Sequence, residues 1–163
     1  MTHFSKNQKF PITKDAAIIS EMRSLFPNFK EDLHKLLAGM AGCSPFLFEL
    51  IKKEVNWITN VLAMELSPEN EVSNEVLKSS DIPKSLRIAK SRIALWTAMQ
   101  DLSGTWELED VSKCLSRFAD FCVNVSLKHA IKVLIVEGKF SKLKNDNDGD
   151  KLGIFILAMG KLG

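Results

Sequence analysis

Apolar residues recur at intervals of three and four along most of the chain, which is the spacing of an amphipathic α-helix. Proline and glycine residues interrupt this pattern at the points where helices begin or end. Together they predict helices between Thr13 and Pro27 and over 30–40, 44–54, 56–66, 80–102 and 107–138. The predicted fold class is therefore mainly α.

Several predicted helix ends depend on single residues. We expect Thr13 to cap the first helix, and Ser44 to cap the third with Pro45 in its first position. Gly39 and Gly42 are expected to end the second helix. The polar segment 67–83 is predicted to be either a mobile connection or a weak helix.

The helix over 80–102 is predicted to be the central one. The second half of 80–102 is apolar almost all round, which favours a buried helix. In 44–54, the inward residues are expected to be Phe46, Leu47, Leu50 and Ile51. In 107–138, the core stripe is expected to comprise Leu108, Val111, Leu115, Phe118, Cys122, Val125, His129, Val133 and Val136.

The pattern changes after residue 138. A charged loop is followed by a short apolar run over 153–159, which has the length of a β-strand, and then by a glycine turn. A strand without a neighbour leaves an edge that pairs with other chains. We therefore expect the isolated chain to aggregate or dimerise through its C-terminus, and a monodisperse monomer in sedimentation would contradict this.

Composition limits the classes of protein to consider. A chain of 163 residues with 45% hydrophobic content fits one globular domain, and its formal charge of +2 does not indicate nucleic acid as a partner. No apolar run has the length of a signal peptide core or a membrane span, so we predict a cytoplasmic protein without a membrane partner. Cys43, Cys114 and Cys122 lack metal-site spacing and are expected to be buried free thiols.

Most candidate chemical groups also have a plain structural interpretation. The acidic run 145–150 does not match a calcium loop, because Lys144 and Phe155 fall where carboxylate ligands belong. His3, His34 and His129 are scattered, and His129 is expected at the edge of the core. The tryptophans are expected in the core; they are Trp57, Trp96 and Trp106.

Two basic features remain. Lys84, Arg87, Lys90 and Arg92 either bind phosphates or an acidic partner or form the solvated side of a helix, which is the favoured interpretation. Arg92 lies nearest the apolar section. The glycine turn, with Gly160, Lys161 and Gly163, exposes backbone N–H groups that can hold phosphate oxygens, although the Walker spacing is absent.

The segment 86–120 resembles the helical region that precedes the first nucleotidyltransferase domain in the bifunctional glutamine synthetase adenylyltransferase and adenylyl-removing enzymes. The family pattern there is a leucine-arginine pair, a lysine and an arginine, an alanine-leucine helix and D-L-x-G-x-W-x-L. The matching residues are Leu86, Arg87, Lys90, Arg92, Ala94, Leu95, Asp101, Leu102, Gly104, Trp106 and Leu108. The segments 44–54 and 153–163 are similar to further segments of the same family, in the same order.

The resemblance implies a function and its cofactors. Complete members add AMP to, or remove it from, a tyrosine of glutamine synthetase, using ATP or AMP and Mg²⁺ under nitrogen-status control. The resemblance makes Gly160, Lys161 and Gly163 the first phosphate-holding element of the nucleotide site. The metal-binding carboxylate pair that follows this turn in the family is absent, and Asp148 and Asp150 precede the strand. We therefore assign no catalytic or metal-binding residue.

The sequence thus predicts a truncated N-terminal, deadenylylating half that is inactive alone. The expected organisation is a polar leader with short helices over 1–42, a helical region over 43–138, and the loop, first strand and glycine turn of an incomplete α/β nucleotidyltransferase domain over 139–163. Expected partners are glutamine synthetase, the remaining portion of the enzyme and a nitrogen-signalling protein. The alternative is a non-catalytic helical module that binds glutamine synthetase or a separate catalytic fragment.

Overall fold

The computed structural model describes residues 10–63, 67–139, 153–154 and 156–158. Helices account for nearly all regular structure in these residues, which confirms the mainly α prediction. They are α1 (Ala16–Leu25), α2 (Glu31–Cys43), α3 (Pro45–Lys53), α4 (Val55–Ala63), α5 (Pro68–Lys78), α6 (Ile82–Leu102) and α7 (Leu108–Val136).

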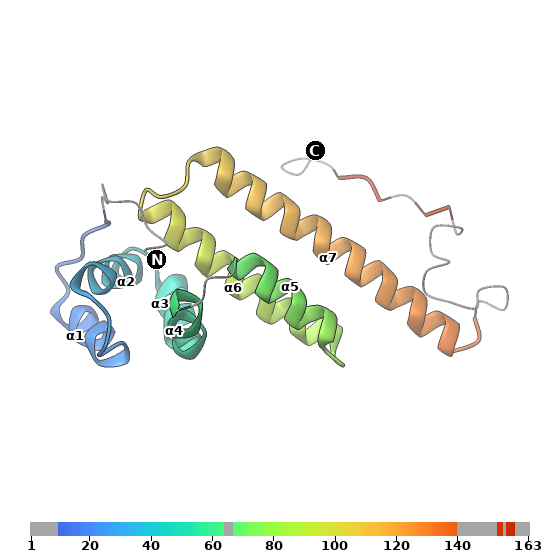
Figure 1. Cartoon of the computed structure of the whole chain (residues 1–163), viewed down its shortest axis with the longest axis horizontal. Helices are drawn as coiled ribbons and strands as arrows, with labels where there is room; N and C mark the ends of the chain where they lie inside the picture. Colours follow the sequence, from blue (N-terminus) through green and yellow to red (C-terminus); the bar gives the residue numbers. More distant parts are fainter. Residues whose placement is uncertain (1–9, 64–66, 140–152, 155, 159–163) are drawn as a thin grey trace.

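Helix α6 is the centre of the arrangement (Figure 1). Its second half contacts α2 and α3, and α5 and α7 pack along its length. Helix α7 runs antiparallel to α6 and is the longest helix described, with 29 residues. The α6–α7 pair therefore joins the group formed by α1–α4 to α5.

One hydrophobic core extends from α1 to α7. The prediction that α6 is buried is confirmed, because Ile93, Leu95 and Met99 are almost completely enclosed although they point to different sides of the helix. Trp57 and Trp96 are buried in the same core, and Trp106 packs at its edge. The division at residues 42 and 138 stays a prediction.

The sequence predicted the N-terminal cap of α3 correctly and that of α1 incorrectly. Ser44 Oγ accepts a hydrogen bond from the Leu47 N–H, and Pro45 opens α3, as predicted. The Thr13 prediction was wrong, because Asp15 caps α1 and accepts from the N–H groups of two residues of its first turn. Thr13 instead accepts a hydrogen bond from the N–H of Asp15.

The predicted end of the second helix was also wrong. Helix α2 passes through Gly39 and Gly42 and ends at Cys43. A Cβ atom on Gly39 would lie 1.9 Å from the carbonyl oxygen of Pro11, and one on Gly42 would lie 2.5 Å from the Thr13 side chain. The glycines therefore serve the close approach of residues 10–13 to the helix, which outweighs their poor helix propensity.

The polar segment 67–83 contains a full helix, α5, rather than a mobile connection. Val72 and Val76 are buried on the face that meets α6, and the remaining positions are mostly polar. These two valines are four residues apart and therefore lie on one side of α5. They give α5 an apolar face although most of its residues are polar.

The predicted core stripe of the last long helix was partly wrong. Of its members, Val125 is buried, and Val111, Phe118, Cys122 and His129 are partly buried. Cys114 and Ile131, which the prediction did not include, are also buried. The other side of the stripe faces solvent: the exposed members are Leu108, Leu115, Val133 and Val136. Phe46, another residue predicted to face inward, is also exposed.

Other expectations have mixed outcomes. Cys114 is buried, Cys122 is partly buried and Cys43 is exposed, so burial was wrong for Cys43. The partly buried position of His129 agrees with its predicted place at the edge of the core. The strand over 153–159 includes residues outside the described ones and stays a prediction.

Candidate functional site

Arg92 lies at the centre of a charged cluster that joins four helices. Its Nε atom donates to Glu54 Oε2 at 2.9 Å, and its Nη1 atom donates to Glu75. The guanidinium also lies over the ring of Trp57, with Cζ 5.5 Å from the ring centroid. Because Glu54 ends α3, Trp57 belongs to α4 and Glu75 to α5, the side chain of Arg92 connects these elements to α6.

The two ion pairs of Arg92 differ in how far their carboxylates are buried. The side chain of Glu54 is 7% exposed and that of Arg92 is 19% exposed, whereas that of Glu75 is 50% exposed. Contacts between charges removed from water are screened less than those at the surface. The Arg92–Glu54 pair is therefore the main contact. It engages the guanidinium of Arg92, which the sequence analysis considered as a phosphate ligand.

Arg87 and Lys90 differ from Arg92 in their surroundings. Both are exposed, and no ion pair with either is found in the part of the chain that the structure describes. Lys90 lies close enough to Cys122 to lower its pKa, although burial, the larger effect, leaves that pKa raised. The basic stretch therefore comprises one structural arginine and neighbours on the solvated side of α6.

Glu71 lies beside the Arg92 cluster in an unfavourable position for a carboxylate. Burial, the larger effect, and the charge of Glu75 raise the pKa of Glu71, and the charge of Arg92 lowers it only in part. Glu71 Oε2 and Trp57 Nε1 are both buried without a hydrogen-bond partner in the described structure. The site therefore favours the protonated form of Glu71 more than water does.

The segment Asp101–Trp106, which carries the family resemblance, forms the turn between α6 and α7. Gly104 has a φ angle of +65°, a conformation that other residues adopt at a cost. The N–H groups of Thr105 and Trp106 donate to the carbonyl oxygen of Gln100, and the Ser103 hydroxyl, which is fully buried, donates to the same oxygen.

The tryptophan of this segment closes the turn against α6. The rings of Trp106 and Trp96 meet edge to face with centroids 6.4 Å apart, a favourable aromatic geometry. The residues of the motif thus hold the antiparallel α6–α7 pair together. Their observed contacts lie within the turn and with the end of α6.

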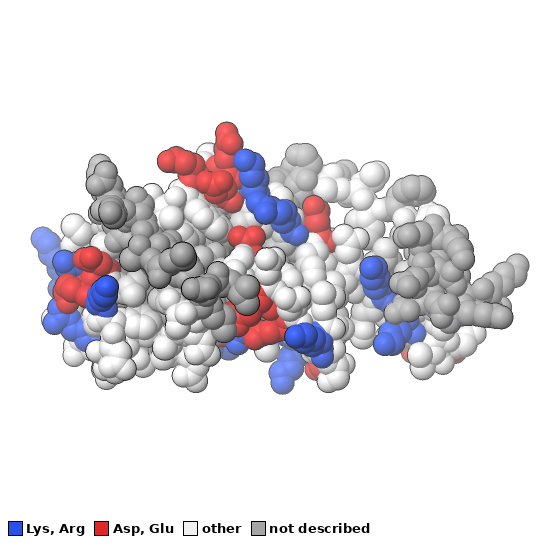
Figure 2. Space-filling view, in the orientation of Figure 1, with Lys and Arg blue, Asp and Glu red and all other residues white. Residues whose placement is uncertain are grey.

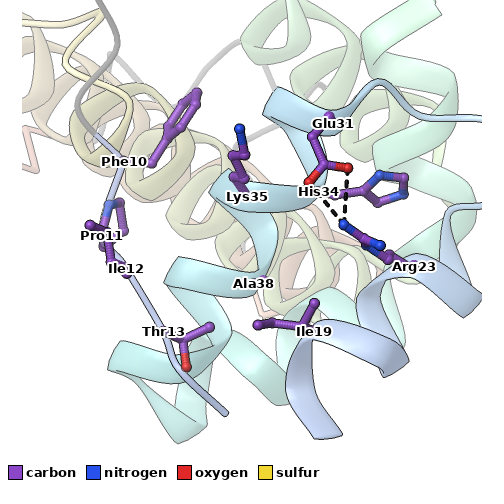
Figure 3. Close-up of a pocket in the computed structure, with 10 residues that line it drawn as sticks. All are labelled: Phe10, Pro11, Ile12, Thr13, Ile19, Arg23, Glu31, His34, Lys35 and Ala38. Atoms are coloured by element: carbon purple, nitrogen blue, oxygen red, sulfur yellow. Dashed lines mark hydrogen bonds and ion pairs between the residues drawn. The ribbon is translucent and has the colours of Figure 1, made fainter. Parts of the chain in front are cut away.

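A pocket of about 770 Å³ lies between residues 10–13 and helices α1 and α2 (Figure 3). Its walls are mainly apolar, and Arg23, Glu31, His34 and Lys35 supply its polar groups. Arg23 Nη2 contacts both Glu31 oxygens, at 2.9 and 3.1 Å. His34 Nε2 lies 2.8 Å from the carbonyl oxygen of Phe26, so this ring nitrogen is the donor. No local pattern of residues indicates this pocket, because its walls come from three separate segments.

A second pocket, of about 480 Å³, lies where the start of α6 meets the last turns of α7. Ile82, Val125 and Val133 contribute apolar surface, and Lys128 and Lys132 add positive charge. Its place at the edge of the α6–α7 pair makes it an extension of the exposed surface of α7.

The residues predicted to bind a cofactor, Gly160, Lys161 and Gly163, lie outside the described residues. Within the described ones, no group of three or more His, Cys, Asp or Glu side chains could hold a metal ion. No helix among them is both long enough and apolar enough to span a bilayer.

Comparison with protein families gives a clear relationship. The family model described as glutamate-ammonia ligase adenylyltransferase matches residues 34–163, which is most of the chain. This chain belongs to the glutamate-ammonia ligase adenylyltransferase family. The match includes all the helices from α3 to α7 and the D-L-x-G-x-W turn between the last two. It confirms the resemblance inferred from the sequence.

Several curated members of the adenylyltransferase family are similar to the chain, each named bifunctional glutamine synthetase adenylyltransferase/adenylyl-removing enzyme. A relative from Bradyrhizobium sp. (strain BTAi1) is 29% identical over 136 residues, covering 78% of this chain and 14% of the relative. One from Caulobacter vibrioides is 28% identical over 134 residues, with the same shares. One from Rhodopseudomonas palustris (strain HaA2) is 28% identical over 158 residues, covering 91% of this chain and 15% of the relative.

The chain therefore spans about 14% of the length of the curated relatives it matches. No solved structure matches it.

Proposed function

We propose that this chain is the helical, non-catalytic part of the deadenylylating half of a glutamine synthetase adenylyltransferase, and that it is inactive alone. The family match over residues 34–163 is the observation that carries the proposal. The bifunctional names of the relatives supply the reaction, addition or removal of AMP on glutamine synthetase. We propose that this chain acts in the cytoplasm.

The contacts of Arg92 support a structural role for the helices. This residue was the strongest candidate for a phosphate ligand in the described part of the family match, and its guanidinium is engaged by Glu54 and Glu75. The D-L-x-G-x-W turn likewise directs its hydrogen bonds at the end of α6. These helices would therefore support a nucleotide site formed by other residues.

Gly160, Lys161 and Gly163 would contribute the phosphate-holding turn of that site. Glycine N–H groups and a lysine ammonium suit the phosphate chain of ATP or AMP. Nucleotidyl transfer also needs metal ions held by closely spaced carboxylates. Asp148 and Asp150 have that spacing but precede the turn, so we propose no Mg²⁺ ligand among the residues of this chain.

A turnover assay tests the inactivity of the chain. The purified 163-residue protein is incubated with adenylylated glutamine synthetase, Mg²⁺ and inorganic phosphate, and the nucleotide released is measured by chromatography. We expect no release above that of the substrate alone. Release that depends on the added chain would show that its own residues complete the site, and the proposal would be wrong.

Binding assays test the remaining parts of the proposal. We expect the chain to be retained by immobilised glutamine synthetase or by the remaining portion of a relative's enzyme, and retention by neither would remove the supporting role. For the turn, Lys161→Ala should weaken ATP binding several-fold in a fluorescence titration. Lys151→Ala, which removes the same charge ahead of the predicted strand, is the matched control, and equal affinities would contradict the assignment.

A further inference from the structure

The pocket between residues 10–13 and helices α1 and α2 has the size and composition of a small-molecule site (Figure 3). Its volume of about 770 Å³ lies in the range of about 300–1,000 Å³ that is usual for such sites, which are mainly apolar with a few polar groups. Its apolar surface comes from all three segments, and the residues are Phe10, Pro11, Ile12, Ile19 and Ala38. Most of these walls lie before residue 34, where the match to the family model begins.

Two glycines of α2 hold residues 10–13 close to the helix. A Cβ atom on Gly39 would lie 1.9 Å from the carbonyl oxygen of Pro11, and one on Gly42 would lie 2.5 Å from the Thr13 side chain. The two glycines are three residues apart, so they lie on one side of α2 and admit alternate residues of the N-terminal segment. Phe10, at the start of this segment, packs partly buried against the core. Close backbone packing therefore builds this wall of the pocket.

The charged side chains of the pocket leave one positive charge unbalanced. Arg23 Nη2 contacts both oxygens of Glu31, at 2.9 and 3.1 Å, so the charges of these two side chains cancel. Lys35 has no ion pair in the part of the chain that the structure describes. His34 Nε2 is engaged by the carbonyl oxygen of Phe26 at 2.8 Å. The groups available to a ligand are therefore the ammonium of Lys35 and the N–H groups of Arg23 that Glu31 does not use.

These charged groups and the apolar floor of the pocket lie in different places. In the close-up, Arg23, Glu31 and Lys35 lie toward the top of the view, and Ile19 and Ala38 lie below them (Figure 3). Figure 2 shows basic and acidic side chains next to each other at the end of the molecule that α1 and α2 form. A ligand with one charged end and an apolar body matches this arrangement.

We propose that this pocket binds a small carboxylate with an apolar body. The carboxylate accepts hydrogen bonds from the Lys35 ammonium and from free N–H groups of Arg23, and the apolar body covers Ile19 and Ala38. One unbalanced positive charge suits a monoanion, whereas the second charge of a phosphate would be repelled by Glu31. A sugar or a nucleobase fits less well, because the apolar walls offer few partners for its polar groups. The proposal is independent of the nucleotide site of the proposed function.

A matched series of three compounds tests the proposal on the purified chain. 4-Phenylbutanoate, 4-phenylbutanamide and 4-phenylbutylammonium share one apolar body and differ in charge. Isothermal titration calorimetry should give saturable binding of the carboxylate with a dissociation constant of about 1 mM or lower, which is ordinary for a ligand of about 12 non-hydrogen atoms. The amide should bind at least about fivefold more weakly, and the ammonium should give no saturable binding.

Backbone amide signals in ¹H–¹⁵N spectra locate the bound compound. Addition of 4-phenylbutanoate should shift the signals of residues that line the pocket on all three segments. The expected set is Ile12, Thr13, Ile19 and Ala38. The same shifts, smaller at equal concentration, are expected with the amide, because its apolar body occupies the same place.

Three variants separate the contribution of charge from that of shape. Lys35→Gln removes the unbalanced charge at an exposed position, and it should weaken the carboxylate at least about fivefold while leaving the affinity for the amide unchanged. Lys53→Gln, the same change at the exposed end of α3 outside the pocket, is the matched control and should leave both affinities unchanged. Gly39→Ala displaces residues 10–13 and should weaken the carboxylate and the amide alike. If Gly39→Ala fails to fold, the comparison of the two lysine variants decides.

Each of the other outcomes overturns the proposal. Absence of saturable binding, or equal affinities for the carboxylate, the amide and the ammonium, would mean that the pocket does not select an anion. Tighter binding of 4-phenylbutyl phosphate than of the carboxylate would exclude the preference for a monoanion. Shifts confined to the second pocket, at residues such as Val133 and Val136, would place the compound on α7 instead. Equal affinities of Lys35→Gln and Lys53→Gln for the carboxylate would remove Lys35 as its partner.

Discussion

Replacing Arg92 by Met tests whether the charged cluster stabilises the fold. Methionine keeps an unbranched apolar stem of similar length, so the packing against Trp57 is largely retained while the charge is removed. Glu54, whose side chain is 7% exposed, then loses the guanidinium that donates to it at 2.9 Å. The perturbation therefore isolates the cost of leaving one buried carboxylate without its partner.

The magnitude follows from burial. Removing one member of a fully buried ion pair costs about 3–5 kcal/mol, because the remaining charge is uncompensated. Arg92 keeps 19% of its side chain exposed, which places the expected loss at the lower end of that range. Glu75, half exposed, adds less than about 1 kcal/mol. We expect Arg92→Met to lower the free energy of unfolding by about 3 kcal/mol.

Urea unfolding followed by circular dichroism at pH 7 measures this loss. Arg87→Met is the matched control, since it makes the same change at an exposed position of α6, and it should shift stability by no more than about 0.5 kcal/mol. In a double-mutant cycle, Glu54→Gln should recover a large part of the loss when combined with Arg92→Met.

Two results would refute this reasoning. A loss below about 1 kcal/mol for Arg92→Met would mean that the Arg92–Glu54 contact behaves as a surface pair. A cycle in which the two substitutions are additive would mean that the two side chains do not stabilise each other. Either result would also reopen Arg92 as a residue available to a phosphate.

Three further changes have expected outcomes of their own. Burial raises the pKa of Glu71, so ionising this carboxyl costs folding stability as the pH rises above its ordinary pKa. Glu71→Gln should therefore be more stable than the parent at pH 7. The difference should vanish when unfolding is measured in acid. Gly39→Ala should lose about 1–3 kcal/mol in urea unfolding, since its Cβ would meet the Pro11 backbone, and a gain would show that residues 10–13 do not hold this position. Gly104→Ala should lose only about 1 kcal/mol by thermal unfolding, because its positive φ is strained but the surrounding space is open.

Sequence was sufficient where local signals decide the structure. Ser44 followed by Pro45 identified the start of α3, and Gly104 identified the end of α6, because these residues act through the backbone beside them. Sequence failed at Gly39, where residues 10–13 pack against the helix and reverse the usual meaning of a glycine. A contact between distant segments leaves no periodic trace.

The candidate site shows the same limit. The basic stretch identified Arg92 as the residue nearest the core, but its main partner Glu54 is 38 residues away and no spacing rule connects them. The exposed side of α7 was missed for a related reason. Its apolar stripe is wider than the surface that α6 can cover, and periodicity alone assigned all of it to the core.

The central position of α6 determines the order in which the chain can fold. Neighbouring helices such as α1–α2 and α2–α3 pack as soon as each pair exists, but α2 and α3 also need α6, which follows them by about 30 residues or more. The first four helices therefore expose apolar surface during synthesis until residue 102 is made. Chains interrupted before that point would be the ones that aggregate, whereas those that include α6 can close the core.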